Sequence, residues 1–241
     1  MIKIIENGQV GQTKLIIDML RTRARIFRDR MKWDVEVDHM NLESDEYDLP
    51  EAFYILSLNE EGRVIGTWRF LPTNSSSMIK NIWPAFTQTL NVPESALMVE
   101  ASRFGVNLDT TQGRFGSINK EETEQPQCSV SDVTAEMIVA LIDISIKCGI
   151  TDMYTMYACS VKRLLDRIGF TPSETSKSLD VEGEQSVIAR FKLDYDLLNA
   201  VKQKTGINSD IQFSELPPNL KTKYLQHEKA NQSAERVRNA A

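Results

Sequence analysis

Two charged side chains interrupt the apolar run MVEASRFGVN, which covers residues 98–107. Glu100 and Arg103 stand three residues apart in a stretch that otherwise has the composition of a buried strand. On a regular strand these two side chains would point to opposite faces, so both can line one cleft only if the strand bends or bulges. Bulges often re-aim side chains beside active sites, and we expect one next to Gly105.

Two more arginines lie within apolar stretches of the sequence. Arg23 lies on the helical stripe of Ile16 and Leu20, which is the face that a helix would bury. Its side chain could extend past the edge of the core into solvent, or it could point into a cleft and bind an anionic group bidentately. Arg69 lies in the β-rich run RVIGTWRFL, at a position that suits a solvent-facing residue, a sheet edge or a cleft wall. Four charged residues in apolar runs together indicate a site.

An acidic segment, WDVEVDHMNLESDEYDLP, follows the first predicted helix at residues 33–50. Such a segment is usually solvated surface. Its Asp45 and Asp48 would nevertheless form a good wall for a positively charged ligand, and Phe27 and Trp33 offer aromatic faces that attract cations. The segment is therefore either solvated surface or one side of a binding site.

The apolar pattern predicts helices that alternate with strands. Amphipathic helices are expected over residues 12–31, 131–149 and 160–169. The expected strands cover residues 2–5, 52–58, 63–71, 98–106, 151–157 and 185–193. The polar stretch 108–130 is expected to be a loop. This alternation predicts an α/β sandwich.

The length and composition fit one sizeable hydrophobic core. The chain has 241 residues, of which 41% are hydrophobic, and we expect a single domain over residues 1–205. Residues 206–241 are polar, and we expect them to form an extension that is a loosely attached helix or disordered.

Composition also argues against several classes of function. A formal net charge of −6 is atypical of a dedicated nucleic-acid-binding protein. The chain holds only two histidines, His39 and His227, which argues against a histidine-based metal site or nucleophilic triad. Its three cysteines, Cys128, Cys148 and Cys159, lack the spacing of disulfide partners or metal ligands and favour a reducing compartment. No apolar run approaches the roughly 18 residues of a membrane span, and the N-terminal run is too short for a signal peptide, so a cytoplasmic protein is expected.

An ordered set of motifs resembles the acyl-homoserine-lactone synthases, the LuxI-type autoinducer synthases. The motifs are RARIF at 23–27, Trp33, ESDEYD at 43–48, GTWRFL at 66–71, IKNIWP at 79–84 and EASRF at 100–104. Their order and spacing agree with the family over roughly residues 1–195. One position departs from it, because Trp83 stands where the family usually has Phe, and this exchange suggests a reshaped pocket wall.

The resemblance implies a single-domain α/β/α sandwich with a mixed, splayed central sheet, similar to the GCN5-related N-acetyltransferases. It implies an acyltransferase of bacterial quorum sensing whose two substrates are S-adenosyl-L-methionine and a fatty acyl thioester, usually on acyl carrier protein. The products would be N-acyl-L-homoserine lactone, methylthioadenosine and the freed carrier. The resemblance implies no metal and no cofactor, since S-adenosylmethionine is consumed. Coenzyme A as the donor, the acyl chain and the oligomeric state stay open.

The resemblance also assigns residue roles. Glu100 and Arg103 are the expected catalytic residues, and Glu100 is expected to take the proton of the substrate amine, directly or through a water. The expected S-adenosylmethionine site comprises Arg23, Phe27, Trp33, Asp45, Asp48, Arg69 and Arg103. The expected acyl pocket comprises Trp68, Trp83, Ser102 and Thr155, where Thr155 matches a family position tied to 3-oxo acyl chains. Lys162, Arg163 and Arg167 are expected to dock an acidic carrier protein, although such charges are usually only solvated.

Two rival interpretations remain at this stage. The first is an acetyl-coenzyme A-dependent N-acetyltransferase of the same fold, but the chain lacks the [QR]-x-x-G-x-[GA] turn of that group. The second is a non-catalytic ligand-binding domain, against which the retention of Glu100, Arg103, Arg23 and both aspartates argues.

Overall fold

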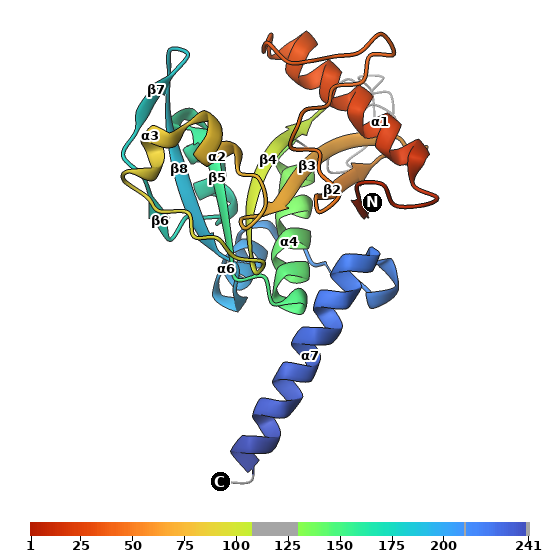
Figure 1. Cartoon of the computed structure of the whole chain (residues 1–241), viewed down its shortest axis with the longest axis vertical. Helices are drawn as coiled ribbons and strands as arrows, with labels where there is room; N and C mark the ends of the chain where they lie inside the picture. The colour runs from red at the N-terminus through yellow and green to blue at the C-terminus, as the bar shows by residue number, and fades with distance from the viewer. Residues whose placement is uncertain (108–129, 210, 240–241) are drawn as a thin grey trace, which may run out of the picture.

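An open mixed β-sheet organises the protein, as the computed structural model of residues 1–107, 130–209 and 211–239 shows (Figure 1). Its strands are β1 (Ile2–Glu6), β2 (Phe53–Leu58), β3 (Val64–Pro72), β4 (Met98–Val106), β5 (Asp152–Ala158), β6 (Glu174–Thr175), β7 (Leu179–Val181) and β8 (Glu184–Lys192). The strand order is β1-β2-β3-β4-β5-β8-β6, and β7 also pairs with β8. Among the strands of the described residues, only β4 and β5 pair in parallel.

The parallel pair divides the sheet into two parts. Strands β4 and β5 pair only from Met98 with Asp152 to Ala101 with Thr155. Beyond that point β4 continues against β3, while β5 continues against β8. The expected mixed, splayed sheet is therefore confirmed, and the opening lies directly after Ala101.

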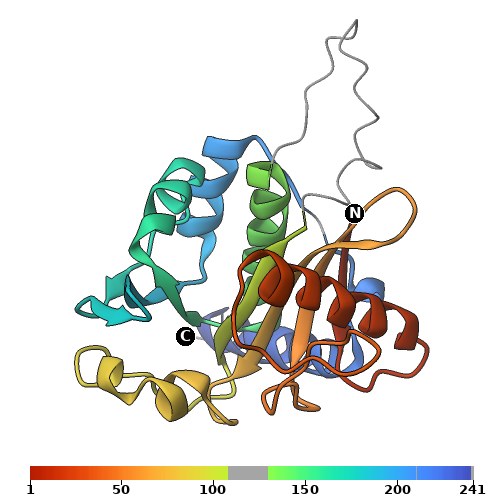
Figure 2. The same ribbon diagram turned by 90° about the horizontal axis from the view of Figure 1, so that it is seen from above.

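Helices cover both faces of the sheet, which confirms the α/β/α sandwich (Figure 2). On one face, α1 (Thr13–Ala24) packs on β2 and β3 through a cluster that includes Met19, Tyr54 and Val64. On the other face, α4 (Val130–Cys148) forms the centre of the main hydrophobic core. The helices α5 (Lys162–Ile168) and α6 (Tyr195–Thr205) contact α4 on that side.

The helix expected over residues 12–31 is continuous, but its second part is a π-helix, η1 (Arg25–Arg30). Ile26 and Phe27 of η1 are buried and lie against β4. This close approach requires Gly105, because a Cβ atom there would lie 2.9 Å from Cγ2 of Ile26. The packing of η1 thereby fixes the position of Phe27 relative to β4.

Two short helices, α2 (Met78–Ile82) and α3 (Pro84–Thr87), connect β3 to β4. A 3-10 turn, η3 (Cys159–Val161), joins β5 to α5, and another, η4 (Phe213–Glu215), precedes the last helix. The loop expected over residues 108–130, with Cys128, lies outside the described residues except for Val130, where α4 begins.

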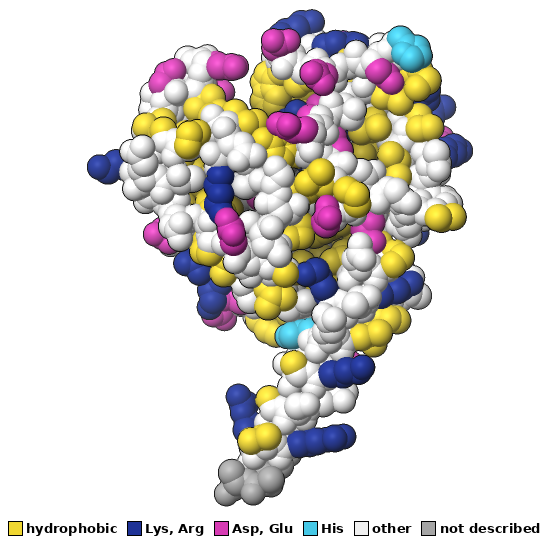
Figure 3. All heavy atoms as spheres, in the orientation of Figure 1, with side chains coloured by type: hydrophobic (Ala, Val, Ile, Leu, Met, Phe, Trp, Pro, Cys, Tyr) yellow, Lys and Arg dark blue, Asp and Glu magenta, His cyan; other side chains and the backbone are white. Residues whose placement is uncertain are grey.

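The C-terminal segment is anchored at its start and projects at its end. Ile211, Leu216 and Leu220 are buried in the main core, and the Glu6 carboxylate accepts hydrogen bonds from the backbone amides of Asn219 and Leu220. The helix α7 (Pro218–Asn239) then leaves the body of the protein, with basic side chains along its exposed length (Figures 1 and 3). No helix among the described residues is long and apolar enough to cross a membrane.

Candidate active site

A β-bulge brings neighbouring residues of β4 to one face of the sheet. The register between β3 and β4 shifts between Thr67 and Arg69, and Arg103 adopts a φ of 54°. Ser102 accepts a hydrogen bond from Nε of Arg69 at 3.0 Å, and Arg103 reaches Glu43 on the same side, toward α1. The expected bulge beside Gly105 is therefore confirmed, and it turns Arg103 toward the face that Glu100 and Ser102 share.

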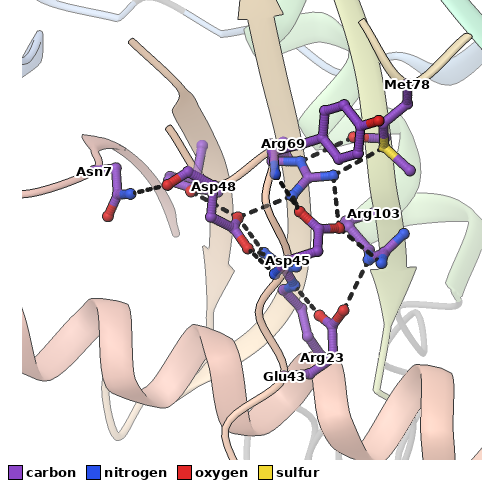
Figure 4. Close-up of polar contacts among 11 residues, drawn as sticks. Asn7, Arg23, Glu43, Asp45, Asp48, Arg69, Met78 and Arg103 are labelled. Carbon is purple, nitrogen blue, oxygen red and sulfur yellow. Dashed lines mark hydrogen bonds and ion pairs between the residues drawn. The ribbon is translucent and has the colours of Figure 1, made fainter. Parts of the chain in front are cut away.

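Three arginines and three carboxylates form a buried network there (Figure 4). Arg23 of α1 donates to Glu43 and binds Asp48 bidentately, at 2.7 and 3.0 Å. Arg69 of β3 binds Asp45 through both terminal nitrogens and lies 3.0 Å from Asp48. Arg103 binds Oε1 of Glu43 at 3.0 Å and Oδ2 of Asp45 at 2.8 Å. The formal charges of the six side chains cancel, so the network can be buried without an unpaired ion.

Mutual pairing fixes the ionisation of Arg23 and Asp48. Burial alone would lower the pKa of Arg23, but Asp48 and Glu43 raise that pKa above its usual value. Burial works against the charge of Asp48 in the same way, yet Arg23 and Arg69 hold the pKa of Asp48 well below its usual value. Arg23 and Asp48 are therefore both charged at neutral pH.

Exposure decides which members of the network a ligand can meet. Arg23 and Glu43 are fully buried, so Arg23 does not extend into solvent, which was one of its two expected placements. The side chains of Asp45 and Arg103 retain 17% and 12% of their exposure. A ligand would thus reach Asp45 and Arg103 first, while Arg23 holds the acidic segment in place.

One residue of this network, Glu43, and one that bonds to it, Tyr54, were not assigned from the sequence. Glu43 lies in the motif ESDEYD but had no assigned role, and the structure places it between Arg23 and Arg103. Tyr54 of β2 donates to Oδ1 of Asp48 at 2.9 Å. For Glu43 the motif itself was the available signal, whereas nothing local marks Tyr54.

An aromatic wall borders the exposed side of the network. Phe27 and Trp33 stack with ring centroids 5.1 Å apart, and the backbone amide of Trp33 donates to the carbonyl of Phe27. The guanidinium carbon of Arg103 lies 5.5 Å from the centroid of Phe27. Cation–π attraction therefore already operates at this wall, as expected for a surface that attracts a cation.

A cavity of about 380 Å³ opens where β4 and β5 separate. Its polar end contains Ser102 and Arg103 together with Phe27 and Trp33. Its remaining walls are mostly apolar and include Trp68, Phe104, Ile138, Met153, Thr155, Met156, Leu165, Phe170 and Phe191. One continuous space thus joins Arg103, the member of the charged network that lines it, to an apolar channel.

The residues assigned to the acyl pocket do not all meet in this cavity. Trp68, Ser102 and Thr155 line it, and the Thr155 hydroxyl donates to the carbonyl of Ala101 at 3.0 Å. Trp83 lies apart, packed on the cluster that includes Ile79 and Phe86 between the α2–α3 segment and the sheet. Direct contact between Trp83 and an acyl chain stays a prediction.

Glu100 lies under α2. Its carboxylate accepts hydrogen bonds from Oγ of Ser77 at 2.5 Å and from the amide of Ile79 at 3.1 Å. Burial raises the pKa of Glu100 above its usual value, although these two donors oppose the shift. A buried carboxylate with a raised pKa is suited to accept a proton near neutral pH.

The three basic residues of the expected docking surface lie on α5 and are exposed. Lys162 is paired with Asp166, one turn further along the helix. Arg163 and Arg167 share one helical face. The neighbouring side chains of Leu164 and Leu165 line the cavity, so this basic surface borders it.

Comparison with known proteins identifies the family. A family model described as autoinducer synthase matches residues 8–201. The acyl-homoserine-lactone synthase of Aliivibrio fischeri is 33% identical over 150 residues, which cover 62% of this chain and 70% of that protein. The enzyme of the same description from Pseudomonas aeruginosa is 32% identical over 183 residues, covering 75% and 83% of the two chains.

The solved structures agree with this assignment. The crystal structure of the acyl-homoserine-lactone synthase LasI has a TM-score of 0.65 and 26% identity, and it covers 87% of this chain and 98% of its own. BjaI, described as a coenzyme A-dependent synthase, shares the fold with a TM-score of 0.72 at 21% identity, over 88% of this chain and 92% of its own. The family match decides against the two rival interpretations, and this chain belongs to the autoinducer synthase family as an acyl-homoserine-lactone synthase.

Proposed function

We propose that this synthase joins the amine of S-adenosylmethionine to the acyl group of an acyl carrier protein thioester and then closes the lactone. The observation that carries the proposal is a continuous cavity that runs from Arg103 of the charged network, beside Phe27 and Trp33, into an apolar channel where β4 and β5 separate. Its polar end suits an amino acid with a sulfonium group, and its apolar walls suit a fatty chain.

In this proposal S-adenosylmethionine binds at the polar end. Arg103 holds the substrate carboxylate, for which its planar fork is suited, and Asp45 attracts the cationic part. Phe27 and Trp33 provide the aromatic wall for the sulfonium or the adenine. Arg23, Asp48 and Arg69 act by holding the acidic segment, because they are paired with one another and lie deeper than Asp45 and Arg103.

Acylation requires a free amine, whose pKa is about 8 for an α-amino group. Glu100 takes the proton, directly or through a water, and the amine attacks the thioester carbonyl while the thiol leaves on the carrier. The substrate carboxylate then attacks its own γ-carbon, a new carbon–oxygen bond forms, and methylthioadenosine departs with the electrons of the broken carbon–sulfur bond. This second step depends on positioning rather than on a further acid or base.

We propose acyl carrier protein as the donor because of the charge and the position of the basic surface on α5. Arg163 and Arg167 are exposed beside the cavity on a chain whose net charge is −6, and a local basic surface is what an acidic carrier protein requires. Coenzyme A is the alternative donor, and the fold shared with BjaI is compatible with either.

The direct test incubates the purified protein with S-adenosylmethionine and either octanoyl- or 3-oxo-acyl carrier protein. The organic extract is analysed by mass spectrometry, and the corresponding coenzyme A thioesters are run in parallel. We expect N-acyl-homoserine lactone with higher kcat/KM from the carrier-bound donor. Equal or better use of coenzyme A thioesters would overturn the choice of donor, and no lactone from any of these donors would overturn the proposed function.

The role of Glu100 has its own test. Glu100→Gln should reduce acylation by roughly 100-fold or more, as expected for loss of a general base, and leave the Kd of S-adenosylmethionine within several-fold. Turnover at the wild-type rate would exclude Glu100 as the base.

A further inference from the structure

The first turn of α2 encloses the Glu100 carboxylate. Ser77 is the N-cap residue of α2, and its Oγ accepts from the amide of Lys80 at 3.2 Å while it donates to Oε2 of Glu100 at 2.5 Å. The amide of Ile79 donates to Oε1 at 3.1 Å. Each carboxylate oxygen therefore has a donor from this turn, and Glu100 and Ser77 are both buried.

The same turn contacts the charged network. Nη2 of Arg69 lies 3.0 Å from Sδ of Met78, the residue between the two donors. Figure 4 draws this contact. Arg69 in turn binds Asp45 and Ser102. The α2 turn thus sets the position of Glu100 relative to the site proposed for S-adenosylmethionine.

Other groups also act on this carboxylate. The charge of Arg69 and the backbone amide of Met78 lower its pKa, and Tyr47 of the acidic segment is close enough for the two pKa values to interact. Tyr154 of β5 is its register partner in the sheet. Among these side chains, Ser77 supplies the hydroxyl donor at hydrogen-bonding distance, and burial and hydrogen bonding have opposite effects on the pKa of Glu100.

We propose that Ser77 is a positioning residue for acyl transfer, whose hydroxyl holds the Glu100 carboxylate ionised and in one rotamer so that it can receive the proton of the substrate amine. The proposal rests on the proposed function, in which Glu100 is the base. A serine suits the position because one hydroxyl both caps α2 and donates to the carboxylate. Without this hydroxyl, one fewer hydrogen bond would offset the unfavourable effect of burial on the charged Glu100 carboxylate.

The experiment compares Ser77→Ala, Ser77→Thr and Ser76→Ala. The neighbouring Ser76 is exposed and bonds Asn81 instead of Glu100, so it is the matched control. We expect Ser77→Ala to shift the acid limb of the kcat/KM profile to higher pH by about one unit. At a given pH on that limb, the activity would be about tenfold lower than in the wild type. The Kd of S-adenosylmethionine should be unchanged. Ser77→Thr should restore the limb, and Ser76→Ala should match the wild type.

A second readout does not depend on turnover. The Glu100 carboxyl is titrated by ¹³C NMR in the wild type and in Ser77→Ala, with Glu100→Gln used to assign the signal. A higher pKa in Ser77→Ala supports the proposal even if the wild type forms no lactone, in which case only the proposed function fails. The proposal would be overturned if the pKa of Glu100 were the same in Ser77→Ala and the wild type, or if the acid limb of an active Ser77→Ala enzyme did not move. It would also be overturned if the acid limb of Ser77→Thr coincided with that of Ser77→Ala.

Discussion

The buried network of charged side chains is stable because each of its carboxylates pairs with two arginines. Glu43 shows this most clearly, since one of its oxygens accepts from Arg23 and the other from Arg103 while the side chain is fully buried. Removal of its charge would leave the guanidinium groups of Arg23 and Arg103 without part of their negative counter-charge in a site that is almost entirely buried. Such a change lowers the free energy of unfolding strongly, whereas the charge of an exposed carboxylate in the same segment contributes little to it.

Glu43→Gln should therefore lower the free energy of unfolding by about 3 kcal/mol. It should also weaken binding of S-adenosylmethionine, because Arg103 loses one of its anchors. Denaturant unfolding and calorimetric titration measure the two effects. Glu46→Gln makes the same substitution at an exposed position of the segment and should stay within about 0.5 kcal/mol of the wild type. Equal losses in both variants would contradict the role of the network.

The pairing of Asp48 predicts a dependence on pH. Arg23 and Arg69 hold the pKa of Asp48 below its usual value in the folded state, so its charge stabilises the protein above about pH 4 and this contribution is lost as the pH falls further. Asp48→Asn removes the contribution. Urea unfolding at pH 7, 4 and 3 should show a difference between the two proteins that shrinks below about pH 4, and a constant difference would exclude this origin.

At the scale of elements, the site depends on the contact between η1 and β4. The charged residues in apolar runs and the expected bulge were accessible from sequence, since both follow from alternation along a strand. The sequence did not predict the π-helical turn or the enclosure of Glu100 by α2, because each depends on contacts between segments far apart in the chain. The pairing of Ser77 with Glu100, 23 residues away, is an example.

Gly105→Ala tests the contact of η1 with β4. The new Cβ would lie 2.9 Å from Cγ2 of Ile26 and 3.6 Å from Phe27, so η1 must shift and carry the aromatic wall with it. We expect a loss of about 1–3 kcal/mol in stability and weaker binding of S-adenosylmethionine. The double variant Gly105→Ala/Ile26→Ala removes the clashing methyl group and should lose less than the sum of the two single changes. Strict additivity would exclude this clash as the cause.

At the scale of the whole molecule, periodicity predicted the layers but not the opening in the sheet. Helices that alternate with strands require the sandwich, and this inference needs no long-range information. The end of the β4–β5 pairing after Ala101 is set by how β3 and β8 hold their partners, which a single sequence does not encode locally. Composition likewise set residues 206–241 apart, yet Leu216 and Leu220 of that segment belong to the main core.

The distribution of charge over the molecule bears on where an acyl carrier protein can dock. The chain carries a net charge of −6, so an acidic carrier protein would be repelled unless it meets a basic surface near the cavity. Arg163→Glu/Arg167→Glu should raise the KM for the acyl carrier substrate at least about fivefold, with kcat and the Kd of S-adenosylmethionine little changed, and salt should weaken the wild-type interaction. Arg236→Glu/Arg238→Glu makes the same change in net charge at the exposed end of α7 and serves as the control. A similar rise in KM for both double variants would indicate general repulsion, and no rise for the α5 variant would place the docking surface elsewhere.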